Sequence, residues 1–467
     1  MKKEKDYLPG YSSEVRKILE DNNLAVWSEI ILTKPNGARF HGILLPRAAF
    51  TAKDFITIRV LDTGYNIGIE ITKDVKFQKV GEVQGNYRLP SIKVKRNSQI
   101  PNVTLLGTGG TVASRLDYRT GAVLPAFTPE ELFAAVPEIQ SRVNLTPRTL
   151  FEILSENFKP EWWVKTAQEV AKEIEKGVDG VIIGHGTDTM AYTGSALSYF
   201  LQNLPIPVVI LGSQRSSDRP SSDAAINLLN ASTVAGYADC GEVLVCMLGS
   251  TSHKYDYLHQ PTRVRKMHSS RRDTFRSIGV PPLGKIDWLT QEITYFRPIK
   301  PRSSPEEFQL DIKIDPRVAM LYFYPGMNPD ILNSVIDKKY HGVVIIGTGL
   351  GHVSTELYSA LDRAKEEQIP IVMVVQPLWG YCHLRVYETG REMLARGVIE
   401  GSNMIPEAAY PKLIWALGHT GFPPNLDEIK HLMQTNIAGE IRNRETRFGF
   451  SILQGIEPGI KSIFEKI

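Results

Sequence analysis

Two glycine-rich turns that follow apolar segments carry hydroxyl and carboxyl side chains. Thr111 ends the turn GTGGT after VTLL (103–106), and Thr187 and Asp188 lie in GHGTDT after VII (181–183). A threonine hydroxyl attacks a carbonyl carbon only once a base accepts its proton, and glycine turns expose the N–H groups that a developing oxyanion needs. These residues therefore fit amide hydrolysis, with Thr111 as nucleophile, Thr187 and Asp188 orienting a proton carrier, and a lysine of lowered pKa as base.

The same turns fit phosphate binding poorly. The pattern GxxxxGK[ST] is absent, and the glycines at positions 107, 109 and 110 do not match GxGxxG. A nucleotide site here would depend on glycine content alone. Taken singly, each turn also has a plain structural interpretation: TGGT is a tight strand-to-helix turn, and Asp188 caps the helix that follows it.

Alternating strands and helices must hold these turns from about residue 100 onward. Segments such as NVTLLG, DGVIIG and IPVVILG are strand-like, whereas EWWVKTAQEVAKEIEKG and MAYTGSALSYFLQNL have helical spacing. A second alternating unit follows the Pro- and Ser-rich stretch YFRPIKPRSSPEE. The pattern predicts an α/β fold with parallel sheets. Ligands bind such sheets beyond the carboxyl ends of the strands, where the two turns lie.

The first ninety or so residues have a different pattern. Five short segments rich in Val, Ile and Phe (AVWSEIIL, ARFHGILL, DFITIRV, NIGIEI and VKFQKV) are separated by turn signals such as KPNG and DTGYN. Closely spaced strands with no strong helix between them predict a small β-barrel. We interpret this unit as a binding or docking module.

Composition excludes several classes of protein. The chain has 467 residues, 42% hydrophobic and 22% charged, and a net charge of +3 that is low for a dedicated nucleic-acid binder. No apolar run is long enough to span a membrane, and the N-terminus lacks the apolar core of a secretion signal. Three cysteines without a CxxC pair fit a cytoplasmic location. The histidines show no metal-binding spacing, so we expect no metal.

Three segments together resemble the L-asparaginase/glutaminase amidohydrolase family, over about residues 100–435. They are NVTLLGTGGTVAS, VIIGHGTDTMAYT and RVRKMHSSRRDTFRSI. The resemblance implies that Thr111 is the nucleophile, that Thr187 and Asp188 are the family's catalytic threonine and aspartate, and that Lys266, a short distance before FRS, is the catalytic lysine. We expect the arginines near Lys266, including Arg263, to be solvated, with contact to RNA phosphates as the alternative.

The resemblance also implies residues that bind the substrate. Ser155 and Glu156 in EILSENFKPEWW match the family segment that holds the α-carboxylate and α-amino groups. Tyr118 in DYRTGAV matches, more loosely, a tyrosine of the family's mobile loop. His185 we expect to pack or to donate a hydrogen bond at its turn.

The additional N-terminal unit, with SENFKPEWW and GTGLGHVSTEL, resembles the D subunits of archaeal glutamyl-tRNA(Gln) amidotransferases. This implies a glutaminase that needs no cofactor of its own and passes ammonia to a partner, the amidotransferase E subunit. The partner would bind ATP and Mg²⁺ and amidate Glu-tRNA(Gln), and two copies of each protein would form a D2E2 heterotetramer around a homodimer of D subunits.

The domain organisation expected from the resemblance is an asparaginase-like two-domain fold with additions at both ends. The expected units are a β-barrel docking domain (1–95), an asparaginase-like N-terminal domain with the catalytic site (96–300), a linker (301–315), an asparaginase-like C-terminal domain (316–435) and a helical tail (436–467).

Two other functions stay open at this stage. A free-standing L-asparaginase would use the same residues, although catabolism needs no docking module. A non-catalytic amino-acid sensor would use the same pocket, but an intact set of Thr111, Thr187, Asp188 and Lys266 argues against it.

Overall fold

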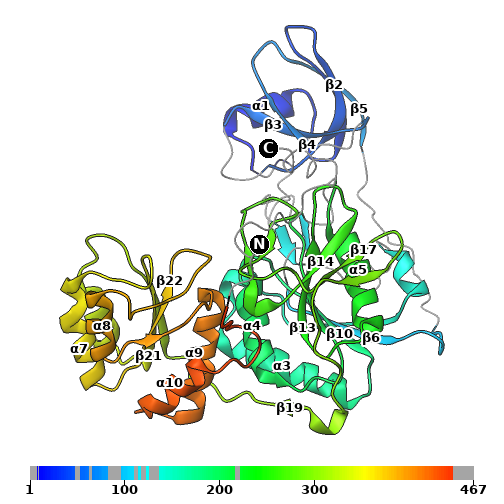
Figure 1. The fold of residues 1–467 in the computed structure, drawn as a ribbon. Coiled ribbons are helices and arrows are strands. Elements are labelled where there is room, and N and C mark those ends of the chain that lie inside the picture. The colour runs from blue at the N-terminus through cyan, green and yellow to red at the C-terminus, as the bar shows by residue number, and fades with distance from the viewer. Residues whose placement is uncertain are drawn as a thin grey trace, which may run out of the picture.

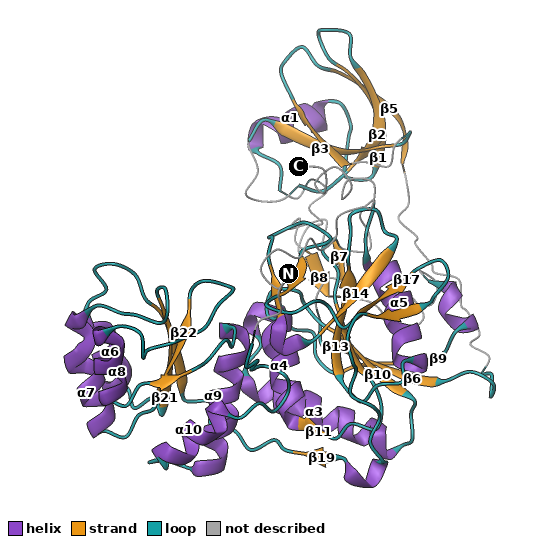
Figure 2. Cartoon of the chain, in the orientation of Figure 1, coloured by secondary structure: helices purple, strands orange, loops and turns teal. Residues whose placement is uncertain are grey.

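An eight-stranded sheet forms the centre of the molecule in this computed structural model (Figures 1 and 2). The structure describes residues 8, 10–47, 53–62, 66–82, 96–109, 114–116, 123–125, 136–215 and 221–444, with the backbone alone for 114–116 and 123–125. The strand order in this eight-stranded sheet is β18-β17-β14-β13-β12-β10-β6-β9. The strands are β6 (Asn102–Gly107), β9 (Asn144–Thr149), β10 (Gly180–Gly184), β12 (Val208–Leu211), β13 (Val243–Leu248), β14 (Tyr255–His259), β17 (Gly284–Asp287) and β18 (Ile293–Tyr295).

Strands β9, β6, β10, β12 and β13 are parallel, as the alternation of strands and helices predicts, and β14, β17 and β18 continue the sheet antiparallel. Helices α3 (Pro160–Glu175) and α4 (Met190–Phe200) cover one face, and α5 (Ala224–Tyr237) covers the other. Both faces are therefore buried, which explains why the central strands are continuous apolar runs. Gly177, predicted to end α3, follows its C-cap with φ 75°.

A second, four-stranded parallel sheet forms the C-terminal unit, in the order β20-β21-β22-β23. Helices α6, α7 and α8 pack on one face and α9 on the other. Helix α10 packs against α9 through its buried Ile429 and Met433. The elements are β20 (Val318–Tyr322), α6 (Pro329–Asp337), β21 (Gly342–Gly347), α7 (Tyr358–Glu366), β22 (Ile371–Val375), α8 (Glu388–Ala395), β23 (Ile399–Glu400), α9 (Pro406–Thr420) and α10 (Leu426–Gln434).

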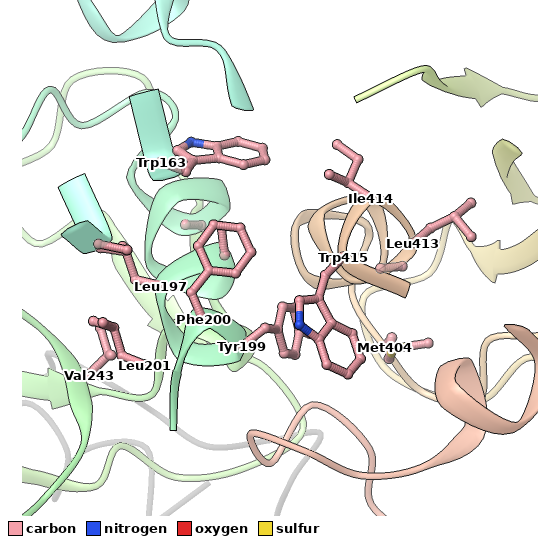
Figure 3. Packing of buried hydrophobic residues seen from close by; sticks show 14 of the residues in the cluster. Trp163, Leu197, Tyr199, Phe200, Leu201, Val243, Met404, Leu413, Ile414 and Trp415 are labelled. Atoms are coloured by element: carbon pink, nitrogen blue, oxygen red, sulfur yellow. The ribbon is translucent and has the colours of Figure 1, made fainter. Parts of the chain in front are cut away.

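One hydrophobic core joins the two α/β units. Helices α4 and α9 lie side by side, and Tyr199 stacks on Trp415 with ring centroids 6.3 Å apart (Figure 3). The Tyr199 hydroxyl donates to the carbonyl of Ala408, 3.2 Å away. Because Tyr199 and Phe200 are fully buried in this core, the units form one continuous packed body rather than two domains on a flexible connection.

The N-terminal unit has a hydrophobic core of its own. All five predicted strands are present: β1 (Ser28–Thr33), β2 (Arg39–Leu44), β3 (Phe55–Val60), β4 (Asn66–Glu70) and β5 (Lys76–Glu82). They form an antiparallel sheet in the order β4-β3-β2-β1-β5, whose edge strands do not pair with each other in the described residues, so the predicted barrel is open there. Helix α1 (Ser13–Asp21) was not predicted, although Ser12 caps it through the N–H of Val15.

Two predicted segments differ in the structure. Residues 301–315, expected to be a linker, contain β19 (Gln309–Leu310), which pairs with β11 (Leu201–Gln202) and so adds an edge contact to the first unit. The helical tail is wrong for residues 436–444, because the last helix ends at Gln434. Residues 445–467 lie outside the described residues.

Among the described helices, none combines the length and apolar character of a membrane span.

The non-helical course of residues 436–444 has a physical cause. Glu440 accepts hydrogen bonds from the N–H groups of Ile437 and Ala438, at 3.0 and 2.7 Å. Its carboxylate also pairs with Lys412 of α9 at 2.5 Å, with both side chains fully buried. These contacts hold the chain in a turn. The pattern of apolar residues in this segment does not reveal them, because one partner, Lys412, lies in α9.

Candidate active site

Strand register brings the predicted turns to one sheet edge. Gly107 of β6 is the neighbour of Gly184 in β10 and of Thr149 in β9, and Gly184 is the neighbour of Leu211 in β12. The four strands end at one level, so the segments that follow them lie side by side. Thr108 ties two of these turns together, because its N–H and its hydroxyl both donate to the carbonyl of Gly184 at 2.9 Å.

Lys266 reaches the second turn from a distant part of the chain. Its Nζ lies 2.9 Å from Thr187 Oγ1 and 2.8 Å from Asp188 Oδ1. The lysine side chain is 16% exposed, whereas Asp188 is 66% exposed. The structure thus brings together three of the four residues expected to be catalytic.

The hydrogen bonds at Lys266 leave the Thr187 hydroxyl in a defined state. Thr187 Oγ1 accepts from the lysine, so its own hydrogen must point elsewhere. In the part of the chain that the structure describes, no acceptor for it is found. The Lys266–Thr187 pair can therefore exchange a proton with a group held at the sheet edge.

A short hairpin places Lys266. Strands β15 (Val264–Lys266) and β16 (Phe275–Ser277) pair antiparallel, with Lys266 opposite Phe275. Phe275 and Val264 are fully buried in the core that also contains α4. The apolar anchors fix the hairpin against the helix that begins directly after the GHGTDT turn, so the lysine and threonine keep a set separation.

Close packing holds Ser155 against the same turn. A Cβ on Gly186 would lie 2.6 Å from Ser155 Cβ and 2.7 Å from its Oγ, so only glycine fits there. The Thr189 hydroxyl donates to the Ser155 carbonyl at 2.7 Å. Ser155 is buried, and Glu156, next in the one-turn helix η3 (Ser155–Asn157), is exposed. Thr189 was missed as a site residue, although it lies inside the motif itself.

His185 acts as a structural donor, as expected. Its Nδ1 lies 2.7 Å from the carbonyl of Gly186, and its Nε2 lies 2.9 Å from the Thr193 hydroxyl, which itself accepts from Trp163 Nε1 at 3.0 Å. The Gly186 carbonyl can only accept, so Nδ1 carries the ring proton, and in the neutral ring Nε2 accepts from the Thr193 hydroxyl. Full burial lowers the pKa of His185 to about 4, so the ring stays neutral at physiological pH.

The expectation of solvated arginines is wrong for Arg263. Its side chain is 1% exposed, and its guanidinium donates to the carbonyl and side-chain oxygens of Asn403 at 2.8 and 3.0 Å. Arg265 pairs with Glu407 of α9 at 3.1 Å. These contacts tie the segment before Lys266 to the C-terminal unit, a relation between distant residues that the sequence does not reveal.

A cleft of about 560 Å³ opens beside Lys266 between the two α/β units. Burial raises the pKa of Glu407 at its wall, and the nearby Arg265 opposes that rise. The cleft is lined by Tyr192, Arg265, Lys266 and Met267 from the first unit and by Met320, Tyr322, Ile346, Gln376, Leu378, Pro406 and Glu407 from the second. Sequence reasoning did not predict this contribution of the C-terminal unit.

Two predicted residues, Thr111 and Tyr118, lie outside the described residues. Thr111 follows Gly109, whose φ of 109° and close approach to Ile153 (2.2 Å from a built Cβ to the carbonyl oxygen) require glycine. Tyr118 lies in the sequence between β7 (Ser114–Leu116) and β8 (Val123–Pro125), which pair antiparallel.

Models of three protein families match the chain. Residues 102–300 match "Asparaginase, N-terminal", residues 317–433 match "Glutaminase/Asparaginase C-terminal domain", and residues 25–80 match "GatD N-terminal domain". The matches follow the three structural units.

Curated relatives are similar over nearly the whole chain. The D subunit of the glutamyl-tRNA(Gln) amidotransferase of Pyrococcus abyssi is 45% identical over 91% of this chain and 97% of that protein. The D subunits of the same enzyme from Pyrococcus furiosus (47%, over 86% of this chain and 91% of that protein) and Methanopyrus kandleri (41%, over 97% and 98%) are similar too.

Solved structures of L-asparaginases share the fold of the two α/β units. The thermostable L-asparaginase of Thermococcus kodakarensis aligns with a TM-score of 0.65 at 33% identity, covering 73% of this chain and all of that chain. L-asparaginase I of Vibrio cholerae aligns with a TM-score of 0.64 at 29% identity, covering 73% of this chain and 99% of that chain.

Proposed function

Since the chain belongs to the family of glutamyl-tRNA(Gln) amidotransferase D subunits, we propose that it hydrolyses glutamine to glutamate and ammonia for conversion of Glu-tRNA(Gln) to Gln-tRNA(Gln). It is the glutaminase subunit of a tRNA-dependent amidotransferase, and its amidohydrolase part is of the asparaginase type. The observation that carries the proposal is the Lys266–Thr187 contact of 2.9 Å at the sheet edge that also holds Ser155.

The chemistry follows from the arrangement of donors and acceptors. Thr111 Oγ attacks the side-chain amide carbon of glutamine, and the negative charge on the amide oxygen is stabilised by N–H groups of the glycine turns. The proton from the threonine passes to the leaving nitrogen, so ammonia departs and an ester of Thr111 remains. Water then attacks the ester, releasing glutamate and returning the proton to Thr111.

Lys266 and Asp188 supply the second proton path. Lys266 accepts a proton through Thr187 as water attacks, and the carboxylate of Asp188, 2.8 Å away, stabilises the resulting ammonium group. Ser155 and Glu156 hold the α-carboxylate and α-amino groups, and Tyr118 closes over the substrate. In this scheme the chain uses no metal and no cofactor of its own.

The proposal includes a partner, the E subunit of the amidotransferase. It binds ATP and Mg²⁺, activates Glu-tRNA(Gln) and accepts the ammonia, and a homodimer of this chain with two E subunits forms the cytoplasmic assembly. The N-terminal unit supports this proposal. It has a hydrophobic core of its own and matches the family model "GatD N-terminal domain", whereas the L-asparaginase of Thermococcus kodakarensis covers 73% of this chain.

A free-standing L-asparaginase is the alternative, supported by the likeness to asparaginase structures. Turnover of asparagine and glutamine by the purified chain, measured with and without the E subunit and Glu-tRNA(Gln), separates the two. The amidotransferase reading predicts glutamine turnover stimulated by the complete complex. Vigorous asparagine hydrolysis by the lone chain, unchanged by partner and tRNA, would favour the alternative.

A further inference from the structure

A second cavity, of about 500 Å³, lies at the opposite edge of the central sheet from the candidate active site. It borders the start of β13 and the end of α4, whereas Lys266 and Thr187 lie near the beginning of α4. The segment 436–442 forms another wall. The polar side chains that line it include Asn203, Gln260, Arg297, Lys300, Asn436 and Arg442.

The positive charges around this cavity form no ion pair within 4.0 Å with a carboxylate of the described residues, although the carboxyl group of Glu242 lies in the same wall. Arg297 donates to Gln260 Oε1 and the Pro281 carbonyl, and neither it nor Arg442 lies within 4.0 Å of a carboxylate there. Arg263, directly behind the wall, donates to Asn403 and to the Gly439 carbonyl, which are both uncharged. Such groups in a protein interior are normally paired, because an uncompensated buried charge is unfavourable.

The arginines also oppose one another. Burial, together with the nearby guanidinium of Arg442, lowers the pKa of both Arg263 and Arg297 to about 10, although Glu440 opposes the shift at Arg263 and Glu242 opposes it at Arg297. The Nε atom of Arg442 is buried without a hydrogen-bond partner in the described part of the chain. A ligand that supplies acceptor atoms and negative charge would relieve both conditions.

We propose that this cavity binds a phosphate group, held by the guanidinium groups of Arg297 and Arg442. Arginine presents a fork of N–H donors that matches phosphate oxygens. Among the described residues, the cavity is lined by three cationic side chains, those of Arg297, Lys300 and Arg442, and by one carboxyl group, that of Glu242. This excess of positive charge favours a dianion over a monocarboxylate as the ligand. The Glu242 carboxyl accepts from the backbone N–H of Lys300, 2.5 Å away, and burial raises its pKa.

The cavity is larger than a phosphate group needs. Leu201, Leu204 and Val243 give it an apolar floor, so a sugar or base attached to the phosphate can lie on them. The phosphate group has two sources: a free nucleotide-sized phosphate ester, or a phosphate of an RNA chain that reaches in from the rim at Lys300.

Calorimetric titration of the full chain at constant ionic strength tests the proposal. The probes are inorganic phosphate, adenosine 5′-monophosphate and a short single-stranded RNA, each compared with potassium chloride. We expect saturable binding of at least one probe. Binding of the monophosphate identifies a free ester as the source, and binding of the RNA alone identifies an RNA phosphate.

Variants separate a ligand site from a structural cluster. Arg442→Gln should weaken binding at least tenfold and, because it removes an uncompensated charge, should not lower the Tm of the ligand-free chain. Lys300→Gln, at the exposed rim, should weaken binding less. Arg363→Gln, which removes a guanidinium paired with Asp337 and Glu367, is the matched control and should bind normally. No saturable binding of any probe, or unchanged binding by Arg442→Gln, would overturn the proposal.

Discussion

At the scale of single residues, the chemistry of the site depends on which groups are buried and which face solvent. Lys266 is largely enclosed while its partner Asp188 is open, so the pair joins the interior to the sheet edge. His185 carries no charge and stabilises the turn through two hydrogen bonds. The same motif, GHGTDT, thus contains one structural histidine and two residues in contact with the lysine.

The neutral state of His185 predicts a pH dependence of stability. The unfolded chain binds a proton to this residue below about pH 6.5, whereas the folded chain does so only near pH 4. The contribution of the neutral His185 to the free energy of unfolding is therefore fully present above pH 6.5, and roughly 3 kcal/mol of it is lost as the pH drops to 4. The free energy of unfolding, measured by urea denaturation at a series of pH values, should change less steeply with pH in His185→Gln than in the wild type. Some pH dependence should remain, because His259 is likewise buried and its pKa is also lowered.

Substitution of the exposed His431 by glutamine is the control, and its slope should match that of the wild type. An unchanged slope in His185→Gln would show that the histidine is not held neutral by burial.

At the level of single residues, the sequence singles out local motifs but does not reveal contacts between distant residues. Thr187 and Asp188 stood out because glycine and threonine follow an apolar strand. Lys266, 79 residues further on, could be assigned only through the family resemblance, because nothing in its neighbourhood distinguishes it from a solvated lysine. Arg263 was misjudged for the same reason, since its partners Asn403 and Gly439 lie 140 or more residues away.

At the scale of elements, strand register and glycine contacts place the site. The ends of β6, β9, β10 and β12 coincide, and Gly186 allows the turn after β10 to touch Ser155. The alternating pattern predicted β6, β10 and β12, but not β9, and not the order or register of the strands. The course of residues 436–444 was unpredictable because a buried ion pair, rather than local propensity, determines it.

Gly186→Ala should impair substrate binding more than folding. The new methyl group would meet Ser155 at 2.6–2.7 Å and displace the residue expected to hold the substrate. We expect the KM for glutamine to rise at least tenfold, measured by ammonia release. Gly184→Ala, two residues earlier, is the control, because its methyl group lies 3.8 Å from Leu105. Equal KM values in the two variants would contradict the role of this contact.

The buried pair of Lys412 and Glu440 predicts a non-additive effect on stability. Lys412→Met leaves a buried carboxylate without its cation and should lower the free energy of unfolding by about 3–5 kcal/mol. Adding Glu440→Gln removes that charge and keeps an acceptor for the N–H groups of Ile437 and Ala438, so the double variant should recover much of the loss.

Urea denaturation measures these effects, and Lys430→Met, at an exposed position of α10, controls for loss of a lysine. A double variant less stable than Lys412→Met alone would show that Glu440 contributes independently of the lysine.

At the scale of the whole molecule, the three units contribute different parts of the structure. The first α/β unit carries Lys266 and its partners Thr187 and Asp188, the second lines the cleft beside Lys266, and the N-terminal unit folds around a separate core. The strand pattern predicted an N-terminal β unit followed by two alternating α/β units, but not the contribution of the second α/β unit to the cleft. The joining of the α/β units through α4 and α9 depends on side-chain packing and was not predicted.

The central claim is that this chain makes ammonia from glutamine for a partner that amidates Glu-tRNA(Gln). Its most direct test is Gln-tRNA(Gln) formation by the reconstituted complex, driven by either glutamine or ammonium chloride, with the wild type, Thr111→Val and Lys266→Met. Each variant should lose glutamine-driven formation by at least about 10³-fold while keeping ammonium-driven formation. Wild-type glutamine-driven rates in both variants, or no Gln-tRNA(Gln) from the wild-type complex with either nitrogen source, would contradict the account.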